Sequence, residues 1–261
     1  MPTKTDDRTD AGRRRFIMRA VTACGAVLLG GCDRLSRSEW FPPLLKTAEK
    51  LTRNAQRLIT PHNAMAQEFT EADLSPRFRS NGTANPESVE YQRLAAGGFA
   101  GYQLKVSGLV ERPRRYSLAE IRALPSRTQV TRHDCVEGWS AIGKWKGARL
   151  AALLDEVGLR PEARYVVFHC ADPMDDAGTK YYESIGLDDA RHVQTLLAYE
   201  LNDEPLPVAN GAPIRLRVER QLGYKMAKYV MAIEVVDSFA NIGEGNGGYW
   251  EDQGYEWWAG I

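Results

Sequence analysis

Short strands and short helices, interleaved without a regular order, constrain the fold of this chain most. One run alternates apolar side chains with Arg215, Arg217 and Glu219, which predicts a strand with one buried and one exposed face. Other runs are more continuously apolar. The strands are expected at Tyr102–Val110, Tyr165–Cys170, Pro213–Arg220 and Tyr229–Val236.

Two short helices are expected between these strands. Ser117 and Glu120 form a capping box that opens a helix, and Pro125 ends it. Leu150–Val157 predicts a second helix, with Gly158 placed to terminate it. Because strands and helices do not alternate as in a doubly wound sheet, the sequence predicts an α+β fold of mixed sheets with short helices.

The first 31 residues have the features of an export signal. Arg13 and Arg14 match a twin-arginine motif, a route used by proteins that fold around a cofactor before crossing the membrane. The apolar run 20–31 has the length of a signal sequence and is too short to span a bilayer. Leu29–Cys32 resembles a lipobox, which predicts a lipidated Cys32; an ordinary signal with a chance cysteine is the alternative.

The remaining chain is divided into a leading segment and a body. Residues 32–77 are expected to be an N-terminal helical segment, with an amphipathic helix between Phe41 and Thr60. Residues 78–261 are expected to form the body. Residues 70–98, which span this boundary, contain several turn-forming pairs and are expected to be irregular.

Charge and cysteine content limit the function. The 261 residues carry 34 basic and 34 acidic side chains, and this balance argues against a nucleic-acid-binding protein. After removal of residues 1–31 and lipidation of Cys32, only Cys135 and Cys170 remain as thiols. They could form a disulfide in an oxidising periplasm, which would compete with any use of Cys135 as a ligand.

Cys135 is the strongest candidate for chemistry. It lies among turn-forming and aromatic residues in Arg-His-Asp-Cys-Val-Glu-Gly-Trp-Ser, residues 132–140. Such a thiol is typical of a soft metal ligand or a nucleophile, because the thiolate performs both tasks. A small buried hydrophobic residue is the alternative.

A second group of candidates lies further along the chain. Asn210 and Gly211 form a turn before a strand that carries Arg215, whose planar guanidinium suits a phosphate. Gly223, Tyr224 and Lys225 follow, and they combine a residue that allows close approach with a second cation. Taken alone, Arg215 reads more simply as a solvated charge on a strand.

These motifs together resemble a known family. Cys-Val-Glu-Gly-Trp-Ser, followed by Trp-Lys-Gly at 145–147, is similar to the molybdenum-binding loop of the sulfite oxidase-type molybdopterin-dependent oxidoreductases. Asn-Gly-x-Pro-x-Arg and Gly-x-Lys follow in the family's order. Within the family, the likeness is greatest to the catalytic subunits of bacterial periplasmic methionine sulfoxide reductases. The resemblance implies the sulfite oxidase-type molybdopterin-binding domain.

The resemblance also implies roles for individual residues. Molybdenum would be held by the dithiolene of molybdopterin and by the thiolate of Cys135. Tyr181 would donate a hydrogen bond to the oxygen that is transferred. Cys170 stands where a relative has a threonine that touches the cofactor. The pterin and its phosphate would be bound by Asn81, Asn210, Arg215, Gly223, Tyr224 and Lys225.

Departures from the family pattern bear on the substrate. Ser80 replaces an anion-binding arginine, and residues 136–138 replace the arginines that follow the ligand cysteine in sulfite oxidases. These changes favour reduction of a sulfoxide or similar oxide, by two-electron oxygen-atom transfer, over oxidation of sulfite. Arg79 or Arg132 could supply the missing charge. The alternatives are a sulfite dehydrogenase of the same fold and a lipid-anchored binding protein that has lost the metal.

The expected partners follow from this assignment. The chain has no Cys-x-x-Cys-His haem-attachment motif, so electrons would come from a separate protein, such as a membrane haem protein. The substrate would be a small-molecule or protein-bound oxide. His133 beside the loop is either a proton relay or a structural residue. The aromatic cluster at 249–258 predicts a tail that packs back onto the body, over the edge of the cofactor.

Overall fold

A computed structural model of the chain describes residues 63–261 continuously, together with scattered residues between 38 and 61. Two compact units are defined, Met1–Pro61 and His62–Ile261. The expected signal peptide and Cys32 lie outside the described residues, as does most of the helix expected between Phe41 and Thr60. In the part of the chain that the structure describes, no helix has the length and hydrophobicity of a membrane span.

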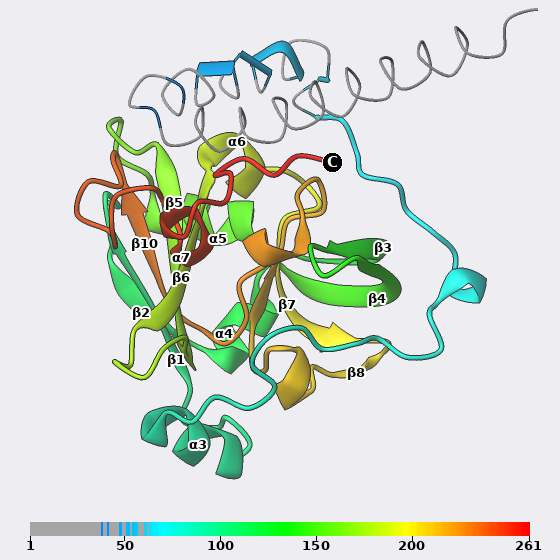
Figure 1. The fold of residues 1–261 in the computed structure, drawn as a ribbon. Helices are drawn as coiled ribbons and strands as arrows, with labels where there is room; N and C mark the ends of the chain where they lie inside the picture. Colours follow the sequence, from blue (N-terminus) through cyan, green and yellow to red (C-terminus); the bar gives the residue numbers. More distant parts are fainter. Residues whose placement is uncertain are drawn as a thin grey trace, which may run out of the picture. The chain divides into compact units, whose positions relative to one another are not determined.

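The second unit contains two five-stranded sheets, drawn on the left and right of Figure 1. The first sheet is mixed, since β1 and β10 run parallel and its other neighbours are antiparallel. Its order is β2 (Arg114–Ser117), β1 (Gln103–Gly108), β10 (Val230–Val236), β5 (Tyr165–Pro173) and β6 (Lys180–Gly186).

The second sheet is antiparallel throughout its pairings. Its order is β3 (Ser126–Cys135), β4 (Trp139–Arg149), β7 (Leu196–Leu201) and β8 (Glu204–Pro205), with β9 (Arg215–Arg217) pairing to β7. The helices are short: α3 (Val89–Ala96), α4 (Leu118–Ala123), α5 (Leu150–Val157), α6 (Leu187–Ala190), α7 (Tyr249–Asp252) and the 3-10 turns η1 (Glu71–Asp73), η2 (Val208–Asn210) and η3 (Gly223–Lys225). The α+β class of mixed sheets and short helices is confirmed.

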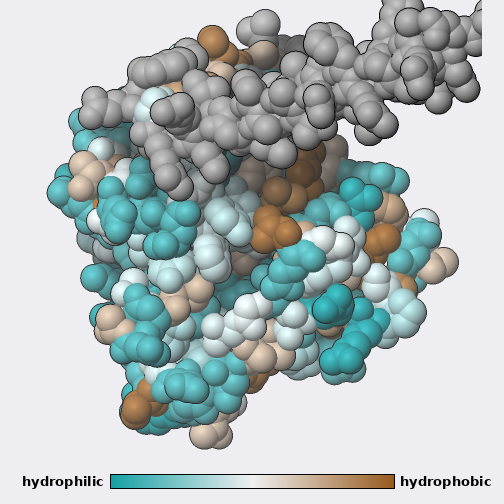
Figure 2. Space-filling view, viewed as in Figure 1, coloured by the Kyte–Doolittle hydropathy of each residue, from teal (hydrophilic) through white to brown (hydrophobic). Residues whose placement is uncertain are grey.

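One apolar core joins the two sheets. It contains Val106 and Ile185 from the first sheet and Ala148, Leu197 and Leu216 from the second, all almost fully buried. On the face drawn in Figure 2, polar residues cover most of the described surface and apolar residues form small groups. Because both sheets pack on one core, the positions of their edges relative to each other are fixed. The loops that carry the candidate functional residues begin at these edges.

Local signals place several elements as expected. Ser117 and Glu120 form the capping box of α4, and α5 begins at Leu150 and ends at Val157 as predicted. Gly158 follows α5 with a φ of 69°, a left-handed conformation that glycine adopts without strain.

Two expectations from the sequence were wrong. The stretch 70–98 is not wholly irregular, since it contains α3, which Ser88 caps and which buries Tyr91 and Leu94. The strand around Arg215 is not half-exposed, because all of β9 is buried and Glu219 beyond it is 3% exposed. The charged face of β9 is covered by an aromatic ring and by an internal ion pair, described below.

The body extends further toward the N-terminus than residue 78. The compact unit begins at His62, whereas the boundary drawn from the sequence lies between residues 77 and 78. Phe69 donates its backbone N–H to the carbonyl of Val130 in β3, and Ser75 bonds in the same way to Ile142 in β4. These backbone hydrogen bonds attach the preceding segment to the second sheet.

Candidate active site

Cys135 lies at the tip of a β-hairpin. It ends β3, and β4 begins at Trp139, with Cys135 and Trp139 paired across the turn. The N–H of Gly138 donates to the carbonyl of Cys135 at 3.0 Å, and Gly138 has a φ of 84°. This tight turn holds the thiol at a fixed position on the edge of the second sheet.

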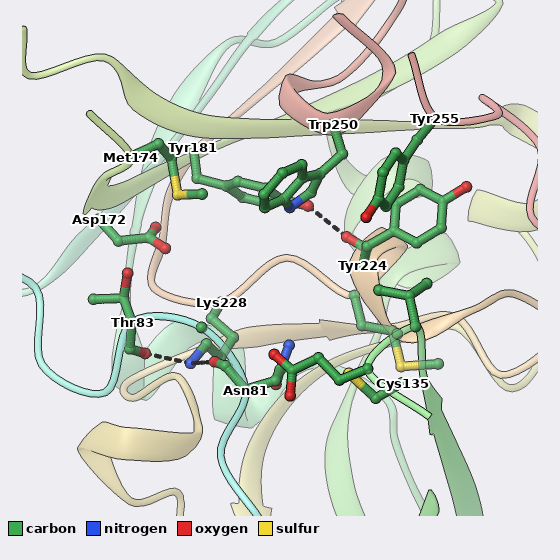
Figure 3. Close-up of a pocket in the computed structure, with 15 residues that line it drawn as sticks. Asn81, Thr83, Cys135, Asp172, Met174, Tyr181, Tyr224, Lys228, Trp250 and Tyr255 are labelled. Carbon is green, nitrogen blue, oxygen red and sulfur yellow. Dashed lines mark hydrogen bonds between the residues drawn. The ribbon is translucent and has the colours of Figure 1, made fainter. Parts of the chain in front are cut away.

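The thiol lines a pocket together with residues from distant parts of the chain (Figure 3). Burial raises the pKa of the Cys135 thiol, so an isolated Cys135 carries a proton at neutral pH. The thiolate form of Cys135 therefore needs a nearby cation or a bound metal ion to stabilise it. The lining residues are Asn81, Gly82, Thr83, Cys135, Val136, Glu137, Asp172, Met174, Tyr181, Gly223, Tyr224, Met226, Lys228, Trp250 and Tyr255.

The pocket has an aromatic side and a polar side. In Figure 3, Tyr181, Tyr224, Trp250 and Tyr255 lie on one side, and Asn81, Lys228 and Cys135 lie on the other. The Tyr181 hydroxyl donates to the carbonyl of Tyr224 at 2.5 Å, and burial raises its pKa well above the ordinary value. Tyr181 therefore stays protonated, and in this arrangement its proton is directed at Tyr224.

Arg215 is a fully buried cation near this pocket. Its guanidinium donates to the carbonyls of Asn210 at 3.1 Å and Met226 at 3.3 Å, and it lies 5.1 Å from the centre of the Trp145 ring. Within the described part of the chain, no carboxylate forms an ion pair with it. Burial, with the nearby charge of Arg217, lowers the pKa of Arg215 to about 9.

Lys228 is a second buried cation bound only by neutral groups. Its ammonium donates to the carbonyls of Asn81 at 2.6 Å and Thr83 at 2.5 Å. Burial, with the nearby charge of Arg215, lowers the pKa of Lys228 to about 7. Two buried cations without carboxylate partners form an environment that a bound anion would stabilise.

The neighbouring Arg217 is a contrasting case. It forms a fully buried ion pair with Glu219 at 2.5 Å and donates toward His133 Nδ1 at 3.1 Å. Burial and the charge of Arg217 lower the pKa of His133 well below its usual value, so His133 is neutral. A neutral, buried His133 that accepts from Arg217 fits the structural reading of this residue.

Comparison with known proteins identifies the domain. The model of the oxidoreductase molybdopterin binding domain matches residues 94–241. This chain belongs to the molybdopterin-binding oxidoreductase family. It is a molybdopterin-dependent oxidoreductase.

Similar proteins carry related names. A protein of Azospira oryzae, named "Putative protein-methionine-sulfoxide reductase subunit YedZ1", is 38% identical over 95% of this chain and 87% of its own length. The protein-methionine-sulfoxide reductase catalytic subunit MsrP of Xanthomonas campestris is 37% identical over 89% of this chain and 72% of its own length. The sulfane dehydrogenase SoxCD from Paracoccus pantotrophus aligns with a TM-score of 0.47 and 23% identity, over 53% of this chain and 39% of that one.

Unpaired polar atoms around the pocket fit the cofactor of this family. Asn81 Oδ1, Asn210 Nδ2, Arg215 Nε and His133 Nε2 are buried without a hydrogen-bond partner. Buried polar groups are rarely left unpaired unless a ligand or water completes them. Together with the cations Arg215 and Lys228, this donor and acceptor set suits a pterin that bears a phosphate.

Several residues predicted from the sequence do gather at this site. Asn81, Cys135, Tyr181, Gly223 and Tyr224 line the pocket directly. Asn210 and Arg215 lie beside it, joined by the hydrogen bond from Arg215 to the Asn210 carbonyl. Motifs far apart in the sequence are therefore brought to one place.

Two predicted residues have other surroundings. Lys225 was expected to bind the phosphate, but its fully buried ammonium forms ion pairs with Glu183 at 2.5 Å and with Glu251, and it does not line the pocket. Cys170 was expected to touch the cofactor, but it is 2% exposed within the apolar core. Both Cys135 and Cys170 are free thiols, so the alternative disulfide is not formed.

Three features of the site were not predicted from the sequence. Lys228 was not singled out, although it follows the Gly-x-Lys motif by three residues and lines the pocket. Asp172 lines the pocket with an unpaired Oδ1, and burial raises its pKa to about 6. The hairpin of β3 and β4 was not predicted, although alternation of apolar residues along 139–149 is a signal for it.

Proposed function

We propose that this enzyme reduces sulfoxides, with methionine sulfoxide in proteins as its substrate. The observation that carries the proposal is the charge of the pocket beside Cys135. Among the lining residues that the structure describes, Lys228 is the one cation, and in this proposal it serves the phosphate of the pterin. A sulfoxide is neutral and needs no convergent positive charge, whereas sulfite does.

The two arginines that could have served sulfite are engaged elsewhere. Arg79 lies over the ring of Trp139, with 5.2 Å from its guanidinium carbon to the ring centre. Arg132 pairs with Asp134 at 2.9 Å. Neither lines the pocket. The names of the relatives from Azospira and Xanthomonas also support sulfoxide reduction.

The protein's own residues have distinct tasks in this proposal. Cys135 would bind the metal, while Asn81, Asn210, Arg215 and Lys228 would hold the pterin and its phosphate. The molybdenum–molybdopterin group supplies two-electron redox chemistry when it is bound. The sulfoxide takes up two electrons and two protons, its sulfur–oxygen bond breaks, and the products are a thioether and water.

The remaining assignments rest on the sequence and on the relatives' names. We infer export by the twin-arginine route and a periplasmic location from Arg13 and Arg14, with Cys32 as the lipid anchor. The relatives are named as subunits, which supports a separate partner that supplies electrons. A membrane haem protein would suit a lipid-anchored enzyme.

Turnover assays on the metal-loaded enzyme test the function. A peptide containing methionine sulfoxide, dimethyl sulfoxide and trimethylamine N-oxide are supplied with a reduced viologen dye, and sulfite is supplied with ferricyanide. We expect reduction of the sulfoxides and little oxidation of sulfite. Rapid sulfite oxidation without sulfoxide reduction would instead establish a sulfite dehydrogenase.

Substitution of the two thiols provides a matched pair. We expect Cys135→Ala to lower turnover by about 1,000-fold or more and to reduce the molybdenum retained, because the proposed metal ligand is lost. Cys170→Ala should keep the turnover and the molybdenum content of wild type, because Cys170 lies in the apolar core. Equal molybdenum and activity in wild type and Cys135→Ala would show that Cys135 is not the ligand.

A further inference from the structure

The aromatic side of the pocket comes from two parts of the chain. Tyr181 in β6 and Tyr224 in η3 lie within the domain matched by the family model, which ends at residue 241. Trp250 and Tyr255 lie beyond that end, in the C-terminal segment. This half of the lining therefore comes from a segment outside the matched domain.

Three of these side chains form a continuous surface, here called the aromatic wall: Tyr224, Trp250 and Tyr255. The rings of Trp250 and Tyr255 are stacked, with centres 5.3 Å apart and planes at 26°. Tyr224 meets Tyr255 edge-on at 5.2 Å and 84°. Figure 3 shows the wall facing the side of the pocket that holds Cys135 and Lys228.

Tight backbone contacts hold the wall in shape. Gly254 has a φ of 98°, and the turn it makes lets the N–H of Tyr255 donate to the carbonyl of Trp250 at 2.9 Å. The Tyr224 hydroxyl donates to the carbonyl of Glu256 at 2.5 Å. The first bond shapes the C-terminal segment itself, and the second fastens the segment to the body next to Tyr255.

A buried ion pair anchors the helix that carries Trp250. Glu251 in α7 is 4% exposed and pairs with the fully buried Lys225. Lys225 also pairs with Glu183 in β6. Lys225 is therefore a positioning residue for the aromatic wall.

The chemistry of the wall selects a class of ligand. Its ring faces offer apolar, polarisable area and no formal charge, and thioether-type sulfur and methyl groups pack well on aromatic rings. Tyr255 is 41% exposed, so the wall runs from the pocket to its mouth. A methionine sulfoxide side chain has an S-methyl group at its tip and methylenes along its length, and both would meet these rings.

We propose that the aromatic wall binds the S-methyl group and side-chain methylenes of methionine sulfoxide, and that Trp250 and Tyr255 set the preference for this side chain over smaller oxides. The inference rests on the proposed function and identifies the residues that recognise the substrate. It assigns a specificity role to a segment outside the matched domain.

Substitutions at the mouth test this role. Tyr255→Ser and Trp250→Leu remove a ring, and Tyr255→Phe and Trp250→Phe keep one. The control Phe239→Leu removes a ring that packs near Trp257 and does not line the pocket. Two quantities are measured for a capped methionine sulfoxide peptide: Kd by calorimetry without a reductant, and KM and kcat with a reduced viologen dye. Dimethyl sulfoxide is the small comparison substrate.

The expected result is a selective loss of affinity. Tyr255→Ser and Trp250→Leu should raise Kd and KM for the peptide about 10-fold, with kcat within about 2-fold of wild type. The phenylalanine variants and Phe239→Leu should stay within about 2-fold. The KM for dimethyl sulfoxide should change less than about 3-fold in Tyr255→Ser, because that molecule is too short to reach the mouth.

Two outcomes would overturn the inference, and they are distinguishable. If wild type reduces the peptide but Tyr255→Ser and Trp250→Leu bind it as wild type does, the wall has no role in recognition and the proposed function stands. If wild type reduces no sulfoxide, the proposed function fails and the role of the wall fails with it. Because Tyr255 is exposed, its substitution should leave the core intact, and the variant should remain folded.

Discussion

At the scale of single residues, neighbouring arginines on β9 have different environments. Arg215 is surrounded by neutral groups and a ring, whereas Arg217 is paired with Glu219 inside the protein. A buried cation that lacks a carboxylate destabilises the empty fold, and an anionic ligand would relieve that cost. The two arginines therefore allow the proposed binding role of Arg215 to be tested against the structural role of Arg217.

Arg215→Met is expected to impair cofactor retention without unfolding the protein. Loss of two hydrogen bonds to carbonyls and removal of an uncompensated buried charge should nearly cancel, so cofactor-free stability should change by less than about 1 kcal/mol. Molybdopterin retained after purification should fall at least about 10-fold. Urea denaturation and pterin fluorescence measure the two quantities.

The matched control is Arg217→Met, which leaves the Glu219 carboxylate buried without its cation. It should cost about 3–5 kcal/mol of unfolding free energy. Equal losses of stability in both variants would contradict a ligand-binding role for Arg215.

The lowered pKa of Lys228 predicts that the stability of the cofactor-free protein depends on pH. This pKa is lowered in the folded protein to about 7, by burial first and by Arg215 second, while the unfolded chain keeps the ordinary pKa of 10.5. Between pH 7 and 9 the unfolded state therefore binds more protons, and stability rises with pH. Cofactor-free protein should gain about 2 kcal/mol of unfolding free energy over this range.

Denaturation curves at pH 7, 8 and 9 measure this gain, and Lys228→Met should remove most of it. Loaded enzyme should show a smaller rise, because a bound phosphate would favour the charged ammonium. A flat profile for cofactor-free wild type would show that Lys228 is not held in an unfavourable environment.

At the scale of elements, the contact between η3 and the end of β3 positions Cys135. A Cβ added at Gly223 would lie 2.5 Å from the ring of His133 and 3.1 Å from the carbonyl of Asp134. Position 223 therefore requires a glycine, because a side chain there would overlap the residues just before Cys135. The Gly-x-Lys motif contributes a close approach of two backbones at this point.

Gly223→Ala is therefore expected to displace the hairpin tip. The overlap with a buried ring should cost about 1–3 kcal/mol and lower the cofactor content, because Cys135 moves with Asp134. Thermal unfolding and molybdenum analysis measure both effects. Gly97→Ala is the control, since its nearest contacts are 3.6 Å away and its backbone is unstrained; a similar loss in that variant would contradict the steric explanation.

Elements were predictable where the signal was local. The capping box of α4 and the span of α5 follow from a few adjacent residues, and both were predicted correctly. The helix α3 was missed because turn-forming residues surround it and only two of its side chains are buried. The burial of β9 was missed because alternation shows that a strand has two faces and does not show what covers each one.

At the scale of the whole molecule, Lys225 joins three elements. It lies in η3 and pairs with Glu183 of β6 and Glu251 of α7, with all three side chains nearly or fully buried. Desolvation raises the pKa of Glu183 well above its ordinary value in spite of the ammonium. This cluster connects the C-terminal segment to the body.

Lys225→Met is expected to be strongly destabilising, because two buried carboxylates would lose their shared cation. The loss should be about 3–5 kcal/mol of unfolding free energy, measured by urea denaturation. The triple variant Lys225→Met, Glu183→Gln, Glu251→Gln should recover a large part of it, since neutral amides need no counter-charge. If the triple variant is no more stable than the single one, the loss does not arise from buried charge.

The sequence by itself determined the chemistry and the fold class. A cysteine loop followed by Asn-Gly-x-Pro-x-Arg and Gly-x-Lys indicated the family, and the irregular mixture of short elements indicated α+β, because each motif and each short element consists of residues close together in the chain. Tertiary structure alone decided which cations are left without a carboxylate. It paired Lys225 and left Arg215 and Lys228 to neutral neighbours, since pairing depends on distances between segments far apart in the chain.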